Sequence, residues 1–401
     1  MGNIISLSNS SLALIVMLGV LALGYLLGRI EIKGISLGSS GVFIVAIITG
    51  CILASVCDIQ DKLIPSTLLG SIDSIVKVVK NLGLIFFITA IGFSAGPVFI
   101  KTLKNGGLQF VLISVTVIIT GLLTTLVIYF IDSDLSIEAA LGLMMGALTS
   151  TPGLSSASSA FSGSSSLIDA TNAIAYPFGV LGACLFVQIM PKFFSKSLEE
   201  SKTKLKQNNQ ETNQSQQEKM ELFKIDKMGL ALYCLAGIVG VFIGSLTIPG
   251  INFKLTTTGG CLVSGLIFSS IKNVGKVSLI IPKETLQVLK EFGLILFLFG
   301  SGISGGLEFI EIISNYPIYF VYGMLITLIP MVVGFVLSLV VFKLDILTNL
   351  GAITGAMTST PALGALEQVA QTDDVSACYT ATYPIALFLL VIIPQIVKIF
   401  F

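Results

Sequence analysis

Long stretches without a charged residue fill most of the chain, and they determine its predicted fold class. Most of them reach the roughly 17–25 residues that a helix needs to cross a membrane. The pattern therefore predicts an all-α polytopic membrane protein. The uncharged stretches are Met1–Gly28, Ile35–Cys57, Leu82–Ile100, Gly106–Ile131, Ala139–Ile168, Ala170–Met190, Met228–Phe253, Leu255–Ile271, Phe292–Leu307, Ile312–Phe342, Ile346–Leu366 and Val375–Val397.

One pattern of twelve residues occurs twice within these stretches. Leu141–Pro152 reads LGLMMGALTSTP and Leu350–Pro361 reads LGAITGAMTSTP, with eight of twelve positions identical at an offset of 209. Proline breaks a helix, and a break at membrane depth is tolerated only where the freed backbone groups line a cavity or find protein partners. Paired breaks in the two halves of a chain indicate the binding site of a secondary transporter.

The similarity between the two halves extends well beyond this motif. Gly83–Ile100 matches Gly293–Ile310 at nine of eighteen positions, and Lys80, just before the first segment, has Lys290 as its counterpart. Several such blocks in the same order indicate an internal repeat. Other matching positions are Gly24, Gly28 and Gly34 with Gly240, Gly244 and Gly250, and Ala175, Tyr176 and Pro177 with Thr382, Tyr383 and Pro384.

A polar segment divides the chain into two membrane repeats, residues 1–191 and residues 228–401. This segment, Lys192–Lys227, is rich in Lys, Gln, Asn, Glu and Ser and contains no apolar run. Such a composition cannot bury enough apolar area to fold alone, so it predicts a mostly disordered cytosolic linker.

The lysine distribution predicts how the repeats are oriented. Lys101 and Lys104 place the loop after the third span inside, whereas the corresponding loop after Ile310 lacks Lys and Arg and is expected outside. The acidic loop Asp132–Glu138 is expected outside, and its counterpart near Lys343 inside. Corresponding loops on opposite sides mean that the repeats are inverted.

Inversion requires an odd number of crossings in each half, although each half has six uncharged stretches. We expect the stretches around Ala139–Ile168 and Ile346–Asp374 not to cross, because each contains the proline break and the first is dense in Gly and Ser. Each repeat would then have five spans and one re-entrant hairpin, with both chain termini outside the cell. A broken helix that crosses fully is the alternative to the hairpin.

Composition excludes several kinds of function. Hydrophobic residues make up 54% and charged residues only 11%, against about 25% charged in soluble proteins. The chain has no histidine, which excludes a histidine proton relay or metal ligand, and it has no GxxxxGK[ST] phosphate loop. A net charge of zero gives no support to nucleic-acid binding.

The two Thr-Ser-Thr-Pro tips are the primary candidate site. A tip at the membrane midplane presents N–H groups at the positive end of its second helix, which suits a carboxylate, while unwound carbonyls before the proline suit a sodium ion. We therefore predict substrate binding by both tips from opposite sides. The predicted tip residues are Thr149, Ser150, Thr151 and Pro152, with Thr358, Ser359, Thr360 and Pro361.

The last span of each half supplies a second polar set and the candidate coupling groups. Asn172 and Tyr176 share a helix face in one half, and Thr380 and Tyr383 lie in the other; we predict that they contact substrate, with interhelical hydrogen bonding as the alternative. Asp169 and Asp373 are candidates to bind a coupling sodium ion or proton. Arg29, at a span end, is the single arginine, so any anionic substrate must be held by dipoles, hydroxyls or Lys80 or Lys290.

The GALTSTPGL and GAMTSTPAL segments, the glycine-rich third span and the extracytoplasmic termini resemble the aspartate:alanine exchanger family. The resemblance covers both membrane halves and implies two copies of a duplicated membrane domain and exchange of aspartate for alanine. Many family members carry two soluble regulatory domains between the halves, and this chain has only Lys192–Lys227 there. The opposed hairpins are also similar in architecture to sodium:citrate-type elevator transporters.

These observations predict a secondary active transporter of the inner (plasma) membrane for a small carboxylate or amino acid, such as aspartate or alanine. We expect exchange or ion coupling, alternating access of the elevator type, no cofactor and a homodimer surrounded by lipid. The hairpins and last spans would move against the remaining spans. The main alternative is a passive channel for small anions; an intramembrane enzyme is disfavoured because the chain lacks His and paired in-membrane Asp motifs.

Overall fold

Helices form nearly all of the regular structure. The computed structural model describes residues 9–32, 35–36, 40–59, 66–104, 107–193, 223–224, 226–248, 253–254, 256–271, 273–274, 277–278, 280–372 and 374–401. Its strands are only two residues long. The predicted all-helical membrane class is confirmed at this level, with small β-hairpins added between helices.

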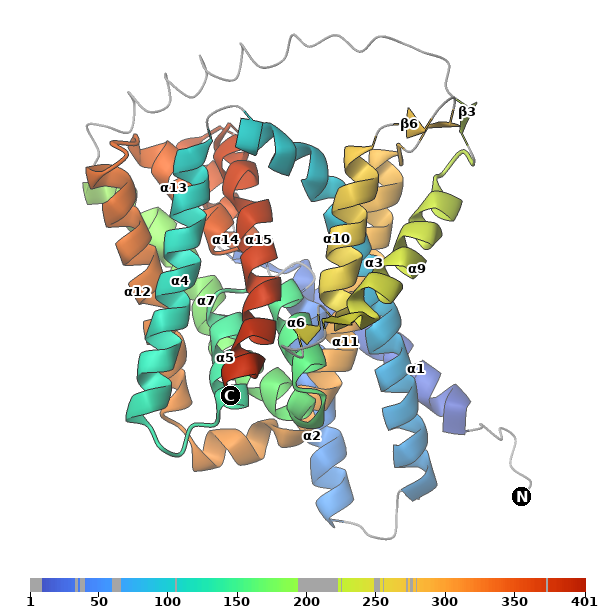
Figure 1. The fold of residues 1–401 in the computed structure, drawn as a ribbon. Coiled ribbons are helices and arrows are strands. Elements are labelled where there is room, and N and C mark those ends of the chain that lie inside the picture. The colour runs from blue at the N-terminus through green and yellow to red at the C-terminus, as the bar shows by residue number, and fades with distance from the viewer. Residues whose placement is uncertain are drawn as a thin grey trace, which may run out of the picture.

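Within the described residues, each half contributes seven α-helices in the same order (Figure 1). The first half has α1 (Asn9–Gly28), α2 (Ser40–Ile59), α3 (Ser66–Lys104), α4 (Leu108–Ile131), α5 (Ile137–Ala147), α6 (Thr151–Ala160), the short 3-10 helix η1 (Ser162–Ser164) and α7 (Ser165–Phe193). The second half has α9 (Leu230–Ser245), α10 (Thr256–Ser270), α11 (Lys283–Asn315), α12 (Tyr319–Val340), α13 (Ile346–Ala356), α14 (Thr360–Ala370) and α15 (Val375–Phe400).

Short strands connect the first two helices of each half. β1 (Glu31–Ile32) and β2 (Ile35–Ser36) pair antiparallel between α1 and α2, and β4 (Thr247–Ile248) and β5 (Phe253–Lys254) do the same between α9 and α10. β6 (Asn273–Val274) and β7 (Val277–Ser278) pair antiparallel, and β3 (Phe223–Lys224) joins β7 in parallel. The end of the expected linker thus belongs to a small sheet, and residues 194–222 lie outside the described residues.

Among the residues that the structure describes, six helical segments are long and apolar enough to cross a membrane. They lie in α3, α4, α7, α11, α12 and α15, and each half contributes three. Helices α9 and α10 have 16 and 15 residues, slightly fewer than the roughly 17–25 that a span needs. The described residues therefore support a multi-pass protein, with fewer full-length spans than the ten that the sequence predicts.

The helices pack into two groups that lie side by side (Figure 1). In the flanking bundle, which we define as α1–α3 with α9–α11, α11 packs against α2 and α3, and α10 against α3 and α9. In the hairpin bundle, which we define as α4–α7 with α12–α15, α5 packs against α7, α13 against α15, and α4 against α12. Each group combines equivalent helices from both halves.

Glycine permits a close crossing of α3 and α11 in the flanking bundle. A Cβ built on Gly83 of α3 would lie 2.7 Å from the Gly293 carbonyl oxygen, and one on Gly293 of α11 would lie 2.8 Å from the Gly83 carbonyl oxygen. The two glycines that the repeat alignment equates thus face each other across the crossing. Gly92 of α3 similarly packs against Gly265 of α10, where the absence of side chains allows the two helices to approach closely.

Helix α6 runs back along the direction from which α5 came. A Cβ on Gly142 would lie 2.5 Å from the Ile168 carbonyl oxygen, and one on Gly179 would lie 2.5 Å from the Gly146 carbonyl oxygen. Early residues of α5 therefore meet early residues of α7, and late residues meet late ones, so the two helices run in parallel. Because α6 joins the end of α5 to the start of α7, α5 and α6 must form a helical hairpin.

The second half repeats this arrangement. A Cβ on Gly351 would lie 2.9 Å from the Val375 carbonyl oxygen, and one on Gly355 would lie 2.4 Å from the Tyr379 carbonyl oxygen. Helix α13 therefore runs parallel to α15, and α14, which joins the end of α13 to the start of α15, runs in the opposite direction. The geometry in both halves is that of a hairpin rather than of a continuous broken helix.

The close packing of α5 on α7 predicts a specific intolerance to side chains. A Cβ on Gly146 would lie 2.4 Å from the Asn172 carbonyl oxygen, so Gly146→Ala must push backbone apart and should cost about 1–3 kcal/mol of unfolding free energy. Gly163→Ala is the control, because nothing lies within 4 Å of its Cβ position. Thermal unfolding in detergent measures both; equal midpoints would contradict the close α5–α7 contact.

Candidate functional site

Local sequence signals produce the two hairpin tips. Ser136 caps α5 by accepting a hydrogen bond from the Ala139 N–H at 3.2 Å, and the helix ends when Leu148 leaves helical geometry. Ser150 is extended and α6 then starts with Pro152 in its first turn, where the missing N–H costs no hydrogen bond. The second half has the same features: Asp345 caps α13, the helix ends at Ala356, and α14 then starts with Pro361 in its first turn.

The two tips meet and exchange hydrogen bonds. The Thr149 hydroxyl donates to the Met357 carbonyl at 3.0 Å, and the Thr358 hydroxyl donates to the Leu148 carbonyl at 3.0 Å. Both acceptors are C-cap carbonyls, which have no partner inside their own helix. Each tip therefore satisfies a carbonyl that the break in the other tip has freed, and all four residues are buried.

The threonines that make these bonds have strained backbones. Thr149 has φ 52° and Thr358 has φ 55°, in the left-handed region that β-branched residues rarely adopt. Strain of this kind costs about 1–3 kcal/mol per residue and concentrates at functional sites. The same strain at equivalent positions of both repeats shows that the surrounding packing enforces the tip conformation twice.

The adjacent serines differ although their backbones match. Ser150 (φ −96°, ψ 95°) caps α6 by accepting from the Gly153 N–H at 3.1 Å. Ser359 has φ −94° and ψ 95° but makes no cap hydrogen bond, and its hydroxyl is buried without a partner. A buried unpaired hydroxyl is costly, so Ser359 is a strong candidate for direct contact with a ligand.

The helix ends at the tips have complementary polarity. The C-terminal carbonyls of α5 and α13 carry partial negative charge, whereas the N-terminal amides of α6 and α14 carry partial positive charge. Carbonyl ends suit a sodium ion or an ammonium group, and amide ends suit a carboxylate. The meeting tips can therefore bind both charges of a small zwitterion, or a carboxylate together with a cation.

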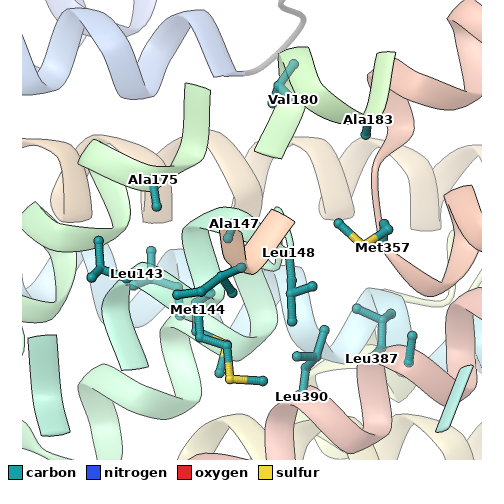
Figure 2. Packing of buried hydrophobic residues seen from close by; sticks show 14 of the residues in the cluster. Leu143, Met144, Ala147, Leu148, Ala175, Val180, Ala183, Met357, Leu387 and Leu390 are labelled. Atoms are coloured by element: carbon teal, nitrogen blue, oxygen red, sulfur yellow. The ribbon is translucent and has the colours of Figure 1, made fainter. Parts of the chain in front are cut away.

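A buried apolar cluster encloses the tips (Figure 2). Leu148 and Met357 come from the two tips, and Ala183 and Leu387 come from α7 and α15. Because this surrounding is apolar, polar interactions at the tips are stronger than they would be in water.

The remaining predicted tip residues lie in the first turns of α6 and α14. Thr151 accepts a hydrogen bond from the Ser155 hydroxyl at its carbonyl, and Pro152 is buried. The Thr360 hydroxyl lies 3.4 Å from the Tyr379 hydroxyl, and Pro361 is partly accessible. Both threonines thus stand at helix N-termini, as the tip interpretation requires.

The four polar residues predicted on the last spans do not lie together in the structure. Asn172 is buried where α7 meets Gly146 of α5, and Tyr383 stacks on Tyr379 with ring centroids 5.0 Å apart. Tyr176 makes an edge contact with Phe43 of α2, which places it where the two bundles meet. Thr380 lies on an exposed face of α15 and donates to the Ser376 carbonyl, so the structure does not bring it to the tips.

Asp169 has a partner that the sequence did not reveal. The carboxylate is completely buried on α7 and forms an ion pair with Lys80 of α3. It also accepts a hydrogen bond from the Ser158 hydroxyl of α6 at 3.1 Å. One feature of the sequence could have indicated that Lys80 has a buried acidic partner: it lies within a membrane-length helix, and the repeat has Lys290 at the equivalent position. The other candidate coupling group, Asp373, lies outside the described residues.

Polar contacts also join α6 to α15 of the other half. The Ser156 hydroxyl donates to the Val391 carbonyl at 2.5 Å, and Gln395 donates to the Ser156 hydroxyl at 2.9 Å. Lys398 donates to the Ala160 carbonyl at the end of α6. These partners lie about 235 residues apart in sequence, so periodicity could not have predicted them.

A cavity of about 650 Å³ opens beside these contacts. It lies between the end of the first hairpin, the end of α15 and the α9–β4–α10 region, and so separates parts of the two bundles. Its lining is mixed in polarity and includes Ser159, Ser162, Ser245, Thr247, Thr256, Thr257, Gln395 and Lys398.

Comparison with known proteins identifies the family. The aspartate–alanine exchanger model, described as "Predicted Permease Membrane Region", matches residues 16–192 and again residues 232–399. The chain belongs to the aspartate:alanine exchanger family. Two copies of the membrane region confirm the internal repeat, and membership identifies this exchanger-family protein as a multi-pass membrane protein of a permease family.

Three relatives of this family member are named as transporters or transport proteins. An uncharacterised transporter of Bacteroides thetaiotaomicron is 24% identical and covers 94% of this chain and 96% of its own length; one of Bacteroides fragilis is 25% identical with the same coverage. A candidate transport protein of Aeromonas salmonicida is 38% identical over 40% of this chain. The first alignment spans 535 positions, so that relative carries segments that this 401-residue exchanger-family chain lacks.

The difference between the two tip serines predicts a difference in stability. Ser150→Ala removes the α6 cap and should lower the unfolding free energy of this exchanger-family protein by about 1 kcal/mol. Ser359→Ala removes a hydroxyl without a partner and should leave stability unchanged or slightly higher. Denaturant unfolding in detergent measures both variants, and an equal loss in both would show that Ser359 also caps its helix.

Proposed function

We propose that the protein is a secondary active transporter for a small carboxylate or amino acid, with the two meeting tips as its substrate site. The observation that carries this proposal is the reciprocal pair of hydrogen bonds between Thr149 and Thr358 and the opposite tips. Two opposed helix breaks that satisfy each other form a site that both halves share, as transporters built from repeats require.

The chemistry of the tips favours a substrate that carries a carboxylate. The N-terminal amides of α6 and α14 and the unpartnered Ser359 hydroxyl can donate to it. The carbonyl ends of α5 and α13 can accept from an α-ammonium group, so amino acids such as aspartate and alanine fit this polarity. Arg29, the single arginine, lies at the end of α1, so no guanidinium clamp is required.

Inverted repeats and elevator-type alternating access complete the proposal. The flanking bundle acts as the scaffold, and the hairpin bundle, including α4 and α12, acts as the moving unit. Small residues at the boundary favour sliding: a Cβ on Gly305 of α11 would lie 2.8 Å from the Asp169 carbonyl carbon. Both chain termini lie on the extracytoplasmic side of the inner membrane, and the scaffold forms the contact between the two subunits of a homodimer.

Substrate binding tests the site. If both tips bind the carboxylate, Ser150→Ala and Ser359→Ala should each lose one hydrogen bond to a charged group, about 1.5–3 kcal/mol or roughly a ten- to hundredfold weaker affinity. Ser155→Ala, one turn into α6, is the matched control because its hydroxyl bonds within its own helix. Binding to purified protein is measured against amino acids and dicarboxylates; unchanged affinity in both tip variants would remove the tips from the site.

Reconstituted protein distinguishes a transporter from a passive channel. Saturable uptake and counterflow in proteoliposomes support alternating access, because an internal substrate then drives uptake of an external one. Flux that rises linearly with concentration and shows no counterflow would favour the channel.

Cysteine labelling tests the inverted topology. Ser133 and Lys343 are both exposed in corresponding loops, and the inverted arrangement places the first outside and the second inside. In a variant without native cysteines, an impermeant thiol reagent should label Ser133→Cys in intact cells and Lys343→Cys only after the membrane is opened. Labelling of both from one side contradicts the inversion.

A further inference from the structure

The buried ion pair between Lys80 and Asp169 connects the two bundles. Lys80 lies on α3 of the flanking bundle, and Asp169 lies on α7 of the hairpin bundle. Their side chains are 13% and 0% exposed, respectively. Removing two charges from water is expensive, so such a pair is weak evidence for stability and strong evidence for function when it lies at membrane depth.

Helix α11 provides a fitted surface for the lysine. A Cβ on Gly300 would lie 2.5 Å from the Lys80 Cβ, so only glycine leaves room for the lysine stem. The Lys80 ammonium lies 5.8 Å from the centroid of the Phe297 ring, close enough for a favourable cation–π contact. Lys80 is therefore held in one position rather than being free to move along the bundle boundary.

The groups around Asp169 resemble the ligands of a small cation. Ser158 of α6 donates to one carboxylate oxygen, and Lys80 binds the other. Ser301 of α11 faces the carboxylate, yet its fully buried hydroxyl has no hydrogen bond of ordinary geometry. A carboxylate and two buried hydroxyls therefore lie together at this position, and the Lys80 ammonium supplies the positive charge beside them. Among the described residues, Lys80 is the charged group that acts on Asp169 from the helices packed around it.

The tips are too far away for a substrate there to contact this pair. Thr149 packs against Gly179, and Gly179 follows Asp169 on α7 by ten residues, which is about 15 Å along a helix. A ligand that contacts this pair directly is therefore a different one from the substrate held at the tips.

We propose that Asp169, Ser158 and Ser301 form a site for a small monovalent cation, a sodium ion or a proton, which Lys80 occupies as a tethered cation in this structure. When the cation neutralises Asp169, Lys80 is released and the contact between the flanking and hairpin bundles is broken. The inference rests on the proposed function, because it assigns cation coupling to the same moving unit.

The thermal stability of the full chain in detergent tests the site without requiring transport. One series replaces choline with sodium at constant ionic strength and pH, and a second varies pH in choline. Lys80→Met removes the competing ammonium. In the sodium series, the sodium concentration for half-maximal stabilisation should then fall by at least about tenfold. If the cation is a proton, half-maximal stabilisation in the pH series should instead move to higher pH. Asp169→Asn keeps the side-chain shape and should abolish the response to the cation.

The control variant is Lys77→Met, which removes an exposed lysine one turn earlier on α3 and should leave the response unchanged. If Asp169→Asn does not fold, Lys80→Met with Asp169→Asn removes both charges and should be stable but insensitive to the cation. A shift in the sodium series alone identifies sodium, and a shift in the pH series alone identifies the proton.

An unchanged cation response in Lys80→Met, with stability restored in the double variant, would overturn the proposal and leave a purely structural ion pair. Substrate exchange in proteoliposomes is measured separately. Normal exchange together with an unchanged cation response refutes only this cation site, whereas absence of exchange with all substrates refutes the proposed function.

Discussion

Backbone hydrogen bonding at membrane depth is the constraint on which the rest of this structure depends. Hydrocarbon offers no partners, so an interrupted helix must find protein groups for its freed carbonyls and amides. Here the interruption in each half is satisfied by the interruption in the other, through the hydroxyls of Thr149 and Thr358. Each break thus provides a hydrogen-bond donor for a carbonyl that the other break frees.

The parallel arrangement of α5 with α7, and of α13 with α15, follows from this constraint. To bring two breaks together from separate hairpins, each first arm must lie close against the last helix of its own repeat. Gly142 and Gly146, with Gly351 and Gly355, remove the side chains that would prevent this approach. Glycine is poor helix material, so its use here indicates that close packing outweighs the propensity cost of about 1 kcal/mol per residue.

Departures from the internal symmetry are as informative as the symmetry itself. Ser150 caps its helix while Ser359, with the same backbone geometry, leaves its hydroxyl unpaired. Asp169 is paired with Lys80 in the first half, whereas the second half has Ser376 at the position aligned with Asp169 and Lys290 at the position aligned with Lys80. The duplicated halves thus hold two similar tips but carry different charged groups.

The sequence alone determined the membrane class, the repeat, the position of the tips and the family resemblance. These depend on local composition, on proline and glycine chemistry, and on matches between segments, all of which are visible along one chain. Whether the break forms a hairpin or a crossing helix was not determined, because both have the same local pattern. It was decided by which residues of α5 meet which residues of α7.

Tertiary structure alone decided which polar groups act together. Asp169 and Lys80 are 89 residues apart, and Ser156 and Gln395 are 239 apart, so nothing in their local sequence connects them. Thr380 shares the residue type of the tip threonines but lies on an exposed helix face, since its orientation depends on how α15 is rotated in the bundle. Hydrogen bonds and ion pairs require positions within a few ångströms, and only the packing of helices from both halves fixes positions to that precision.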